Sequence, residues 1–461
     1  MDIRLHNTFS RKTEVFKPLI PSAVGMYHCG PTVYDFAHIG NLRSYVFADI
    51  VRRVFEYNGY TVNQVINITD VGHLSSDADE GEDKMTKALK RDGKPLTLES
   101  MHEVGAFYTE RFIEDLKSLN IELPQNFPRA SEHIPEDLEI IEKLITQDIA
   151  YTTSDGIYFD TSKFPEYGKL GNIQTDKQQE GNRIAINPEK RNPSDFALWK
   201  FDSKLGWDTS WGKGFPGWHL ECSAMSRKYL GQPFDIHTGG IDHIPTHHNN
   251  EIAQSESAFG LPLANFWLHN EFILQNGGKM AKSAGEYLTL KSLAHEVVSP
   301  LAYRYWLLTA HYRSPMNFTL EAVHAAQTAL IRLITNIRDL PTGGAIATSY
   351  RDRFQTAVND DLDTPQGIAL LWELLKDKNL SDADKRATTE DFDRIFGLNL
   401  ASLSPIEELP VPAEVQALAD AREEARKEKD WGKADALRKE IEARGFEVMD
   451  TTEGIKVREK E

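Results

Sequence analysis

The sequence predicts an α/β protein with a parallel sheet, and three observations lead to this fold class. Residues 24–30 and 61–68 are short apolar runs typical of buried strands. Between them, residues 40–58 place Leu42 and Val46 on one face of a predicted helix. A helix joining two strands in this way makes the strands parallel neighbours. The third observation is that 461 residues, 40% of them hydrophobic, supply apolar material for about three domains.

The later segments follow the same pattern in order. An amphipathic run over residues 97–119 predicts another helix. Residues 125–205 are rich in Pro, Asp and Asn, look less regular, and are expected to be an insertion between two halves of the sheet domain. Strand-like runs return near 234–240 and 267–275. From about residue 296 the pattern is helical, and the chain ends with a charged helix and a strand-like stretch.

Composition excludes several classes of protein. No apolar run is long enough for a membrane span, and no apolar signal segment opens the chain, so we expect a protein away from membranes. Two cysteines exclude a disulfide scaffold and favour a reducing, cytoplasmic setting. The net charge of −18 argues against coating nucleic acid through bulk charge. Residues 421–461 are near neutral and are the best candidate to face a polyanion, although a solvated helix of mixed charge explains them equally well.

A phosphate-binding segment opens the first predicted helix. His38 and Asn41 are spaced i and i+3, so they share a face, and both can donate hydrogen bonds to a phosphoryl oxygen. The N–H groups and dipole at a helix N-terminus also attract phosphate. Gly40 leaves room for a flat base against the backbone. Ligands of parallel sheets bind beyond the carboxyl ends of the strands, which places Cys29 and this segment at the expected site.

Two further segments have nucleotide-binding character. KMAKS, residues 279–283, lies between glycines, and its two lysines suit a mobile clamp for triphosphate charge; a solvated loop is the alternative. Gly239 and Gly240 follow a strand-like run and could pack under an adenine, with Asp242 accepting from ribose hydroxyls. Trp218, earlier in the chain, is an aromatic candidate for the same site, and a plain core residue is the alternative.

The two cysteines belong to a candidate metal site. Cys29 lies at a strand end, and Cys222 is far from it along the chain. His247 and Glu251 are spaced i and i+4 on one helix face. Two thiolates, an imidazole and a carboxylate form a zinc-type ligand set. His248 competes with His247 for this role, and buried reduced thiols beside a surface histidine pair remain the alternative.

In this order and spacing, the segments resemble the cysteinyl-tRNA synthetase family of class I aminoacyl-tRNA synthetases. YHCGPTVYDFAHIGN is similar to the family's first signature and KMAKS to its mobile-loop signature. NITDVGHL, FPRASEHI, GWHLECSAM and PTHHNNEIAQS are similar to blocks between them, and KDWGKADALRKEIEARGFEV to the tRNA-reading end. The resemblance covers nearly the whole chain. It implies ATP-dependent ligation of L-cysteine to tRNA(Cys) through cysteinyl-adenylate.

The resemblance also implies a role for each candidate residue. It makes His38 and Asn41 the α-phosphate contacts, and Lys279 and Lys282 the pyrophosphate-side contacts. The implied groups are, for ATP, His38, Gly40, Gly239, Gly240, Asp242 and Lys282; for cysteine, Cys29, Thr69 and Trp218; and for one zinc ion, Cys29, Cys222, His247 and Glu251.

Three positions depart from the family pattern. Asn41 replaces the second histidine of the common form, Ala281 replaces the first serine of the lysine loop, and Phe215 stands where an arginine is frequent. Asn41 can still donate one hydrogen bond, so we expect activity to survive. The Phe215 change leaves one substrate or loop contact unassigned.

The implied zinc ion would explain how cysteine is told from serine. An apolar pocket separates such close isosteres by only about a hundredfold. A thiol, which titrates near ~8.5, loses its proton readily to a metal, whereas a neutral hydroxyl is a far weaker ligand. We therefore expect zinc to contact the substrate sulfur, with Mg2+ accompanying ATP.

The fold expected with this resemblance is a Rossmann-type nucleotide-binding domain split by an insertion, followed by a helical bundle and a small C-terminal α+β domain. The expected units are residues 1–124, first catalytic half; 125–205, connective insertion; 206–295, second catalytic half with the zinc site and KMAKS; 296–405, helical tRNA-contacting domain; and 406–461, anticodon-recognition domain. We expect ATP, L-cysteine and tRNA(Cys) as partners and a monomer, although the sequence does not fix the oligomeric state.

Two other functions are compatible with parts of this pattern. One is a relative that activates cysteine but delivers it to an amino sugar, which would need no anticodon reader. The other is a catalytically silent paralogue that only binds RNA. The helical and C-terminal regions argue against the first, and the His38, lysine and metal-ligand candidates argue against the second.

Overall fold

The predicted strand–helix–strand unit supplies two neighbouring strands of a four-stranded parallel sheet, one of them an edge strand. It consists of β3 (Ala23–His28), α1 (Ile39–Tyr57) and β4 (Thr61–Ile66), with β3 and β4 parallel. The computed structural model describes residues 1–71, 83–173, 187–275, 278–279, 288–400, 413–428, 430–444, 446–451 and 454–459. The parallel sheet confirms the predicted α/β class.

Two later strands complete this sheet. They are β9 (Phe234–Gly240) and β10 (Ala264–Asn270), and the strand order is β10-β9-β3-β4, with every pair parallel. The two halves of the sheet meet where β3 pairs with β9, although a long stretch of chain separates them. Ligands of open parallel sheets bind beyond the strand ends at such a meeting point. Cys29 follows β3, and Gly239 and Gly240 end β9, so all three lie there.

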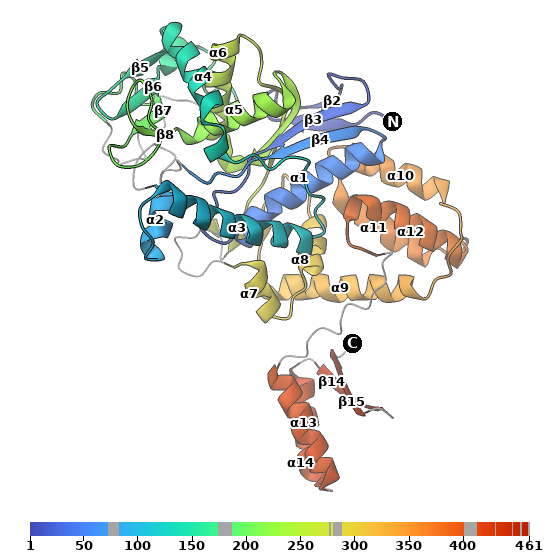
Figure 1. Cartoon of the computed structure of the whole chain (residues 1–461). Helices are drawn as coiled ribbons and strands as arrows, with labels where there is room; N and C mark the ends of the chain where they lie inside the picture. Colours follow the sequence, from blue (N-terminus) through green and yellow to red (C-terminus); the bar gives the residue numbers. More distant parts are fainter. Residues whose placement is uncertain are drawn as a thin grey trace.

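Helices cover both faces of the sheet. Figure 1 shows α1 on one face and α5 (Trp218–Leu230) and α6 (His247–Phe259) on the other. The packing follows from the sequence of α1, in which Leu42, Val46 and Val54 are fully or almost fully buried. Beside the N-terminal end of α1 lie α2 (Lys84–Arg91) and α3 (Leu98–Ser118), which pack on each other.

The region expected to be less regular has an ordered core. It contains α4 (Ile134–Thr146) and an antiparallel sheet of order β5-β6-β7-β8. The strands are β5 (Ala150–Thr152), β6 (Gly156–Phe159), β7 (Phe196–Phe201) and β8 (Gly214–Pro216). They are short, and polar loops separate them, which explains why periodicity did not reveal them. The last strand, β8, lies beyond residue 205.

The helical pattern expected after residue 296 is present. The helices are α7 (Leu290–His295), α8 (Pro300–Leu308), α9 (Leu320–Arg338), α10 (Thr348–Asn359), α11 (Thr364–Lys376) and α12 (Asp382–Phe396). Their apolar faces join α1 in one continuous core, in which Leu330, Phe354 and Phe392 are fully buried. None of the described helices is both long and apolar enough to cross a membrane.

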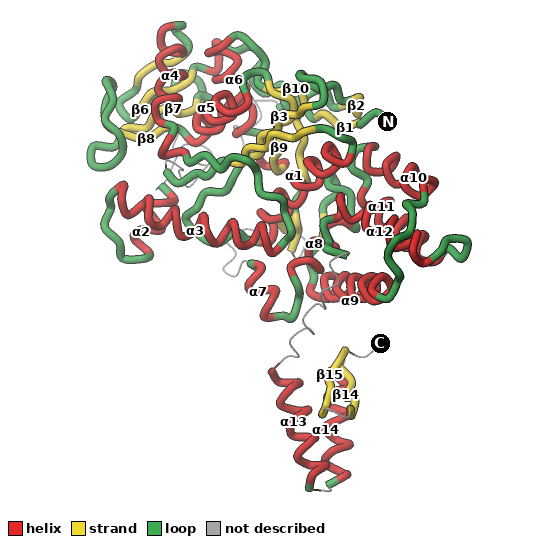
Figure 2. The backbone as a smooth tube through the Cα atoms, turned by 45° about the vertical axis from the view of Figure 1, so that its right-hand side comes forward, coloured by secondary structure: helices red, strands yellow, loops and turns green. Residues whose placement is uncertain are grey.

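The end of the chain forms two helices and a hairpin, where the sequence predicted one charged helix and a strand-like stretch. The elements are α13 (Ala413–Lys427), α14 (Trp431–Ala443), β14 (Phe446–Thr451) and β15 (Gly454–Glu459) (Figure 2). Val415, Ala419, Ile441, Val448 and Val457 form a small core of their own. The remaining described strands form two small sheets. One is the hairpin β1 (Arg4–Asn7)–β2 (Lys12–Val15), and in the other β11 (Ile273–Gln275) lies between β12 (Gly278–Lys279) and β13 (Met316–Asn317).

Candidate active site

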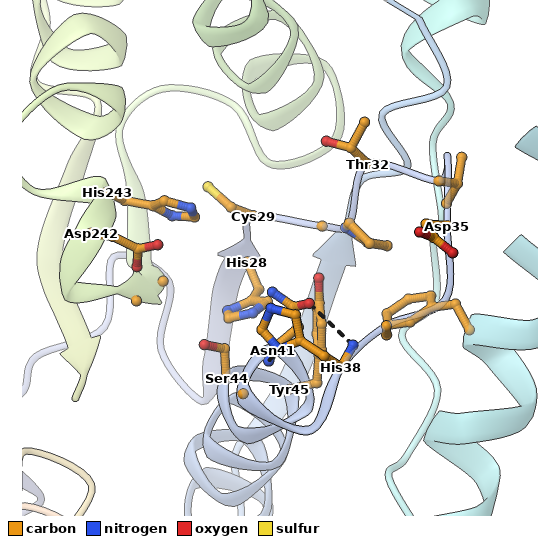
Figure 3. A pocket seen from close by; sticks show the side chains of 18 of the residues that line it. His28, Cys29, Thr32, Asp35, His38, Asn41, Ser44, Tyr45, Asp242 and His243 are labelled. Atoms are coloured by element: carbon orange, nitrogen blue, oxygen red, sulfur yellow. Dashed lines mark hydrogen bonds between the residues drawn. The ribbon is translucent and has the colours of Figure 1, made fainter. Parts of the chain in front are cut away.

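A cavity of about 350 Å³ opens where β3, β9 and the start of α1 converge. Its lining includes most of the residues predicted to bind nucleotide or substrate, namely Cys29, His38, Gly40, Asn41, Trp218, Gly239, Gly240 and Asp242. Figure 3 shows Asp242 and His243 on one side of this space and Thr32 and Asp35 on the other, with His38 and Asn41 at the start of α1. The chain therefore gathers groups from segments far apart in the sequence around one space.

His38 and Asn41 hold each other in place at the start of α1. The Asn41 backbone N–H donates to His38 Nδ1 at 3.0 Å, and the His38 N–H donates to Asn41 Oδ1 at 3.3 Å (Figure 3). This reciprocal cap uses the acceptor atom of each side chain. In the neutral imidazole, the acceptor role of Nδ1 places the proton on Nε2, which makes Nε2 a donor. The sequence predicted the donors; the structure adds the cap that orients them.

Glycine is required at the end of β9. A Cβ atom on Gly239 would lie 2.7 Å from His243 Nδ1 and 2.9 Å from His248 Cε1. Real Cβ atoms do not approach side chains so closely, so a larger residue would displace both histidines. Gly239 and Gly240 both line the cavity with Asp242, which is compatible with the predicted packing of an adenine.

The candidate metal ligands meet directly under this cavity. Cys29 follows β3, Cys222 lies on α5, and His247 and Glu251 lie on α6; all four are buried, and their ligand atoms lie within 4.8 Å of one another. A second, overlapping group combines Cys29 and Glu251 with His237 and His248. The structure thus brings both competing imidazoles to the same place.

The two imidazoles differ in how their ring nitrogens are used. His247 Nδ1 lies 2.8 Å from His219 Nδ1, while His247 Nε2 lies 3.0 Å from Glu251 Oε1 and makes no hydrogen bond within the described part of the chain. His248 has both nitrogens engaged, Nδ1 with His269 Nε2 at 2.8 Å and Nε2 with Cys29 Sγ at 3.3 Å. A buried nitrogen without a partner is costly unless something else binds it.

The electrostatics of the cluster favour a bound cation. Burial opposes ionisation of Glu251, yet His237 and His247 lower its pKa to about 2. Burial likewise works against charge on His247, but Cys222 and Glu251 raise the pKa of its imidazole to about 10. The Cys222 thiol is buried too, and its contacts with Cys29 and His247 lower its pKa to about 6, whereas burial raises the pKa of Cys29. A metal ion bound by such groups displaces their protons.

The donor set fits zinc. Thiolate, imidazole and carboxylate are the groups that Zn2+ takes in proteins. Ligating histidines use one nitrogen for the metal while the other is held by a hydrogen bond. His247 has this arrangement, because His219 holds its Nδ1 while its Nε2 faces Glu251 Oε1 at 3.0 Å.

Thr69 and Trp218, the other predicted cysteine-binding residues, make different contacts. Thr69 is buried; its hydroxyl donates to Glu221 Oε2 at 3.1 Å and accepts from Asn67 Nδ2 at 3.2 Å. Trp218 begins α5, and its ring centroid lies 4.1 Å from that of His247. Trp218 therefore covers the cluster on the cavity side instead of filling a plain core position.

Several polar residues of the site were not predicted. His219, His237 and His269 surround the metal candidates, and Asn67 and Glu221 hold Thr69. All five are buried. His219 and Glu221 stand in the segment GWHLECSAM, but no spacing rule separates a buried polar residue from an exposed one on the same helix, so only their tertiary contacts reveal them.

The two predicted loop lysines are only partly covered. Lys279 belongs to β12, whose backbone pairs with β11 at Leu274. Lys282 lies outside the described residues, as does Ala281. Phe215, the third departure, lies on β8 with its ring 5.7 Å from that of Trp207, so its side chain packs on an aromatic neighbour.

Comparison with known proteins identifies the family. The family model described as tRNA synthetases class I (C) catalytic domain matches residues 15–328, and the model described as cysteinyl-tRNA ligase anticodon binding domain matches residues 410–458. The cysteine–tRNA ligase 1 of Burkholderia lata is 49% identical over 98% of this chain and 96% of its own length. The cysteine–tRNA ligase of Treponema denticola is 41% identical, with 98% of each chain covered.

Solved structures share the fold at low identity. A Mycobacterium tuberculosis methionyl-tRNA synthetase bound by methionyl-adenylate has a TM-score of 0.55 and 15% identity, covering 84% of this chain and 92% of its own. A LeuRS–tRNA–LeuAMS ternary complex from Agrobacterium radiobacter K84 has a TM-score of 0.58 and 11% identity, with 87% and 88% covered. At such identities the likeness concerns the fold alone.

The parallel sheet and the catalytic-domain match define a class I aminoacyl-tRNA synthetase. The anticodon-binding match and the full-length relatives narrow this class: the chain belongs to the cysteine–tRNA ligase family. Its activity is the ATP-dependent attachment of cysteine to tRNA. The family and the kind of enzyme predicted from the sequence are confirmed.

Proposed function

We propose that this chain joins L-cysteine to tRNA(Cys) through a cysteinyl-adenylate and that a zinc ion selects cysteine by its thiolate. The observation that carries the proposal is the buried cluster of Cys29, Cys222, His247 and Glu251 beside the cavity. Cys29 belongs to both, because it lines the cavity and supplies a cluster sulfur. A thiol-recognising group and a nucleotide-sized space are thereby adjacent.

We assign the zinc to Cys29, Cys222, His247 and Glu251. His247 Nε2 supports this choice, because it faces Glu251 Oε1 at 3.0 Å and makes no hydrogen bond within the described part of the chain, whereas His248 Nε2 contacts the Cys29 sulfur. His237 donates to Glu251 Oε2 at 2.9 Å and fixes the carboxylate. When bound, zinc supplies a site for the substrate thiolate, which a serine hydroxyl would occupy far less well.

In the first step the cysteine carboxylate attacks the α-phosphorus of ATP, the bond to the β-phosphate bridging oxygen breaks, and pyrophosphate leaves. The protein contributes position and charge. His38 Nε2, oriented by its cap with Asn41, donates to an α-phosphate oxygen, and the start of α1 adds its dipole. Gly40, Gly239, Gly240 and Asp242 form the adenosine site, and Lys279 and Lys282 neutralise the departing pyrophosphate, with Mg2+ on ATP.

In the second step the cysteinyl group passes to a hydroxyl of the terminal adenosine of tRNA(Cys), and AMP leaves. Trp218 and Thr69 keep the amino acid in place, the first as a wall over His247 and the second through its buried hydrogen bonds. Residues 296–405 contact the tRNA body and residues 406–461 read its anticodon. The catalytic domain comprises residues 1–124 and 206–295, and residues 125–205 are the insertion between its halves. The chain works as a monomer in the cytoplasm.

The test combines metal analysis with two activity assays. We expect one zinc per chain by elemental analysis of the unchelated protein, loss of zinc in His247→Ala, and retention in His248→Ala with affinity lowered about 10–100-fold. Pyrophosphate exchange should be fast with cysteine and far slower with serine, and bulk tRNA should be charged.

Each competing function gives a different result in the same experiment. Exchange with serine as fast as with cysteine, or protein without stoichiometric metal, would overturn the zinc selection. Exchange without tRNA charging would indicate a small acceptor such as an amino sugar, and absence of both would leave an RNA-binding paralogue.

A further inference from the structure

A buried arginine, Arg43, lies in the second turn of α1, directly after the predicted phosphate-binding residues. Only 4% of it is exposed. Its Nη1 donates to the Phe272 carbonyl at 2.6 Å, and its Nη2 donates to the Tyr312 carbonyl at 3.2 Å and to the Ser314 carbonyl at 2.6 Å. These carbonyls belong to the segments that lead into β11 and β13, so one side chain joins α1 to both strands.

The hydrogen-bond partners of Arg43 among the described residues are neutral carbonyl groups. Burial lowers the pKa of its guanidinium to about 10 in spite of the Glu271 carboxylate, so Arg43 still carries its charge at neutral pH. A buried charge costs desolvation energy that well-packed apolar side chains do not, which makes this arrangement a poor source of stability. What the planar fork of donors supplies is a fixed distance between α1 and the two strands.

The backbone on either side of the predicted lysine clamp contacts the start of α1. Before the clamp, β12, which carries Lys279, pairs with β11, and Arg43 holds the Phe272 carbonyl directly before β11. After the clamp, the Leu288 carbonyl accepts from the Ile39 N–H at 2.8 Å, and Ile39 is the first residue of α1. The strand that carries Lys279 and the helix start that carries the phosphate-binding residues are therefore held together from both sides.

We propose that Arg43 is a positioning residue for adenylate formation, which holds the strand of Lys279 at the distance from His38 that one bound triphosphate requires. Arg43 is absent from the lining of the cavity, so it acts through the groups that it holds. In such a constellation a displacement of about 1 Å lowers the rate by about 100-fold. The inference rests on the proposed roles of His38 and Lys279 and adds the side chain that relates them.

Arg52, on the same helix, provides a matched control. It is 8% exposed, its Nη1 donates to the Leu123 carbonyl at 2.9 Å, and its Nε donates to Glu56 Oε1 at 2.8 Å. Neither acceptor lines the cavity or belongs to β11, β12 or β13. Removal of either arginine takes a buried guanidinium away from a backbone carbonyl, but only Arg43 joins α1 to the strands beside Lys279.

The experiment measures cysteine-dependent pyrophosphate exchange for Arg43→Gln, Arg43→Lys and Arg52→Gln in the full-length zinc-loaded chain, with zinc content and urea unfolding measured on the same samples. For Arg43→Gln we expect kcat to fall by about 100-fold. KM for cysteine and zinc content should stay unchanged, because Arg43 contacts neither the metal cluster nor the residues beside it. Arg43→Lys keeps the charge but not the planar fork and should lose less activity. Arg52→Gln should lose stability and keep kcat.

A double-mutant cycle with Lys279→Ala separates positioning from a general loss of structure. If Arg43 acts through Lys279, Arg43→Gln should slow exchange far less in the Lys279→Ala background than in the wild type. Should Arg43→Gln fail to fold, the cycle is completed with Arg43→Lys.

Four results would overturn the positioning role alone: unchanged kcat in Arg43→Gln, additive losses in the cycle, zinc content that falls in parallel with exchange, or an equal loss of kcat in Arg52→Gln. A different result would identify a failure of the proposed function. If Lys279→Ala by itself exchanged pyrophosphate as fast as the wild type, the assignment of Lys279 to pyrophosphate would be wrong, and the positioning role would fall with it.

Discussion

At the scale of single residues, His38 has a structural role in the cap of α1 and a proposed role at the α-phosphate. Its Nδ1 accepts from the Asn41 N–H and closes the start of α1, and the same contact directs its Nε2 proton outwards. Thr97 caps α3 in the same way, accepting from the Ser100 N–H at 3.1 Å, but it does not line the cavity. Substitutions at the two caps can therefore be compared to separate an effect on helix stability from an effect on catalysis.

For His38→Ala we expect pyrophosphate exchange to fall by about 100- to 1000-fold, because a donor to the developing phosphate charge is lost. The free energy of unfolding should fall by only about 1 kcal/mol through loss of the cap. Pyrophosphate-exchange assays measure the loss of activity, and urea titrations measure the free energy of unfolding.

Thr97→Ala is the matched control. It should lose a similar amount of stability and keep its exchange rate. If the two variants lost activity equally, His38 would act only as a cap, and the assignment of its Nε2 to phosphate would be wrong.

At the scale of elements, the C-terminal helices and hairpin form a unit with its own small core. Contacts within it join α13 to α14, β14 to β15 and α14 to β14. Residues 401–412, which precede α13, lie outside the described part of the chain. A unit that supplies its own core can be removed without exposing the core of the catalytic sheet.

A chain ending at residue 405 should therefore keep cysteine-dependent pyrophosphate exchange and lose most tRNA charging. The physical reason is that the cavity and the metal cluster lie wholly outside this unit, whereas the match to an anticodon-binding domain lies within it. Charging by the full chain should weaken as salt rises, because phosphate contacts release counterions. Charging unaffected by the truncation would contradict the proposed role of the unit.

At the scale of the whole molecule, a buried ion network joins the catalytic sheet domain to the helical region. Asp49 on α1 accepts from Arg304 on α8 and from Arg53, and the Arg304 Nε also donates to the Phe396 carbonyl at the end of α12. Asp49 and Arg304 are almost completely buried. Burial opposes the charge on Asp49, but Arg304 and Arg53 lower its pKa below the ordinary value.

We expect Asp49→Asn to reduce the free energy of unfolding by about 3–5 kcal/mol, since it leaves buried guanidinium charge without its partner. The lowered pKa of Asp49 means that its contribution is present above the unfolded-state pKa, near ~3.9, and is lost as pH falls through the folded-state pKa. The difference between wild type and variant should shrink in this acid range, as measured by urea unfolding against pH.

The exposed pair of Arg338 and Asp339 provides the control. Its atoms lie 3.3 Å apart at the end of α9, with both side chains more than half exposed. Asp339→Asn should change the free energy of unfolding by at most about 1 kcal/mol. Equal effects of the two substitutions would show that the buried network does not stabilise the contact between the two regions.

A feature of the fold or of the candidate site could be predicted from the sequence where its sequence pattern is local. The central strand–helix–strand unit was predicted to within a residue or two, because helix periodicity and a glycine-marked helix end are short-range patterns. The antiparallel sheet β5-β6-β7-β8 was not predicted, because its strands are short and pair across long loops.

The sequence by itself determined the α/β class, the start of α1 and the residue types of the candidate metal and nucleotide site, since each follows from composition and spacing along one element. Only the tertiary structure brought Cys29 and Cys222 together, distinguished His247 from His248 by the hydrogen bonds of their nitrogens, and buried Asp49 against Arg304. These features join groups far apart in the chain, and burial and hydrogen-bond partners are properties of the packed molecule and not of any one segment.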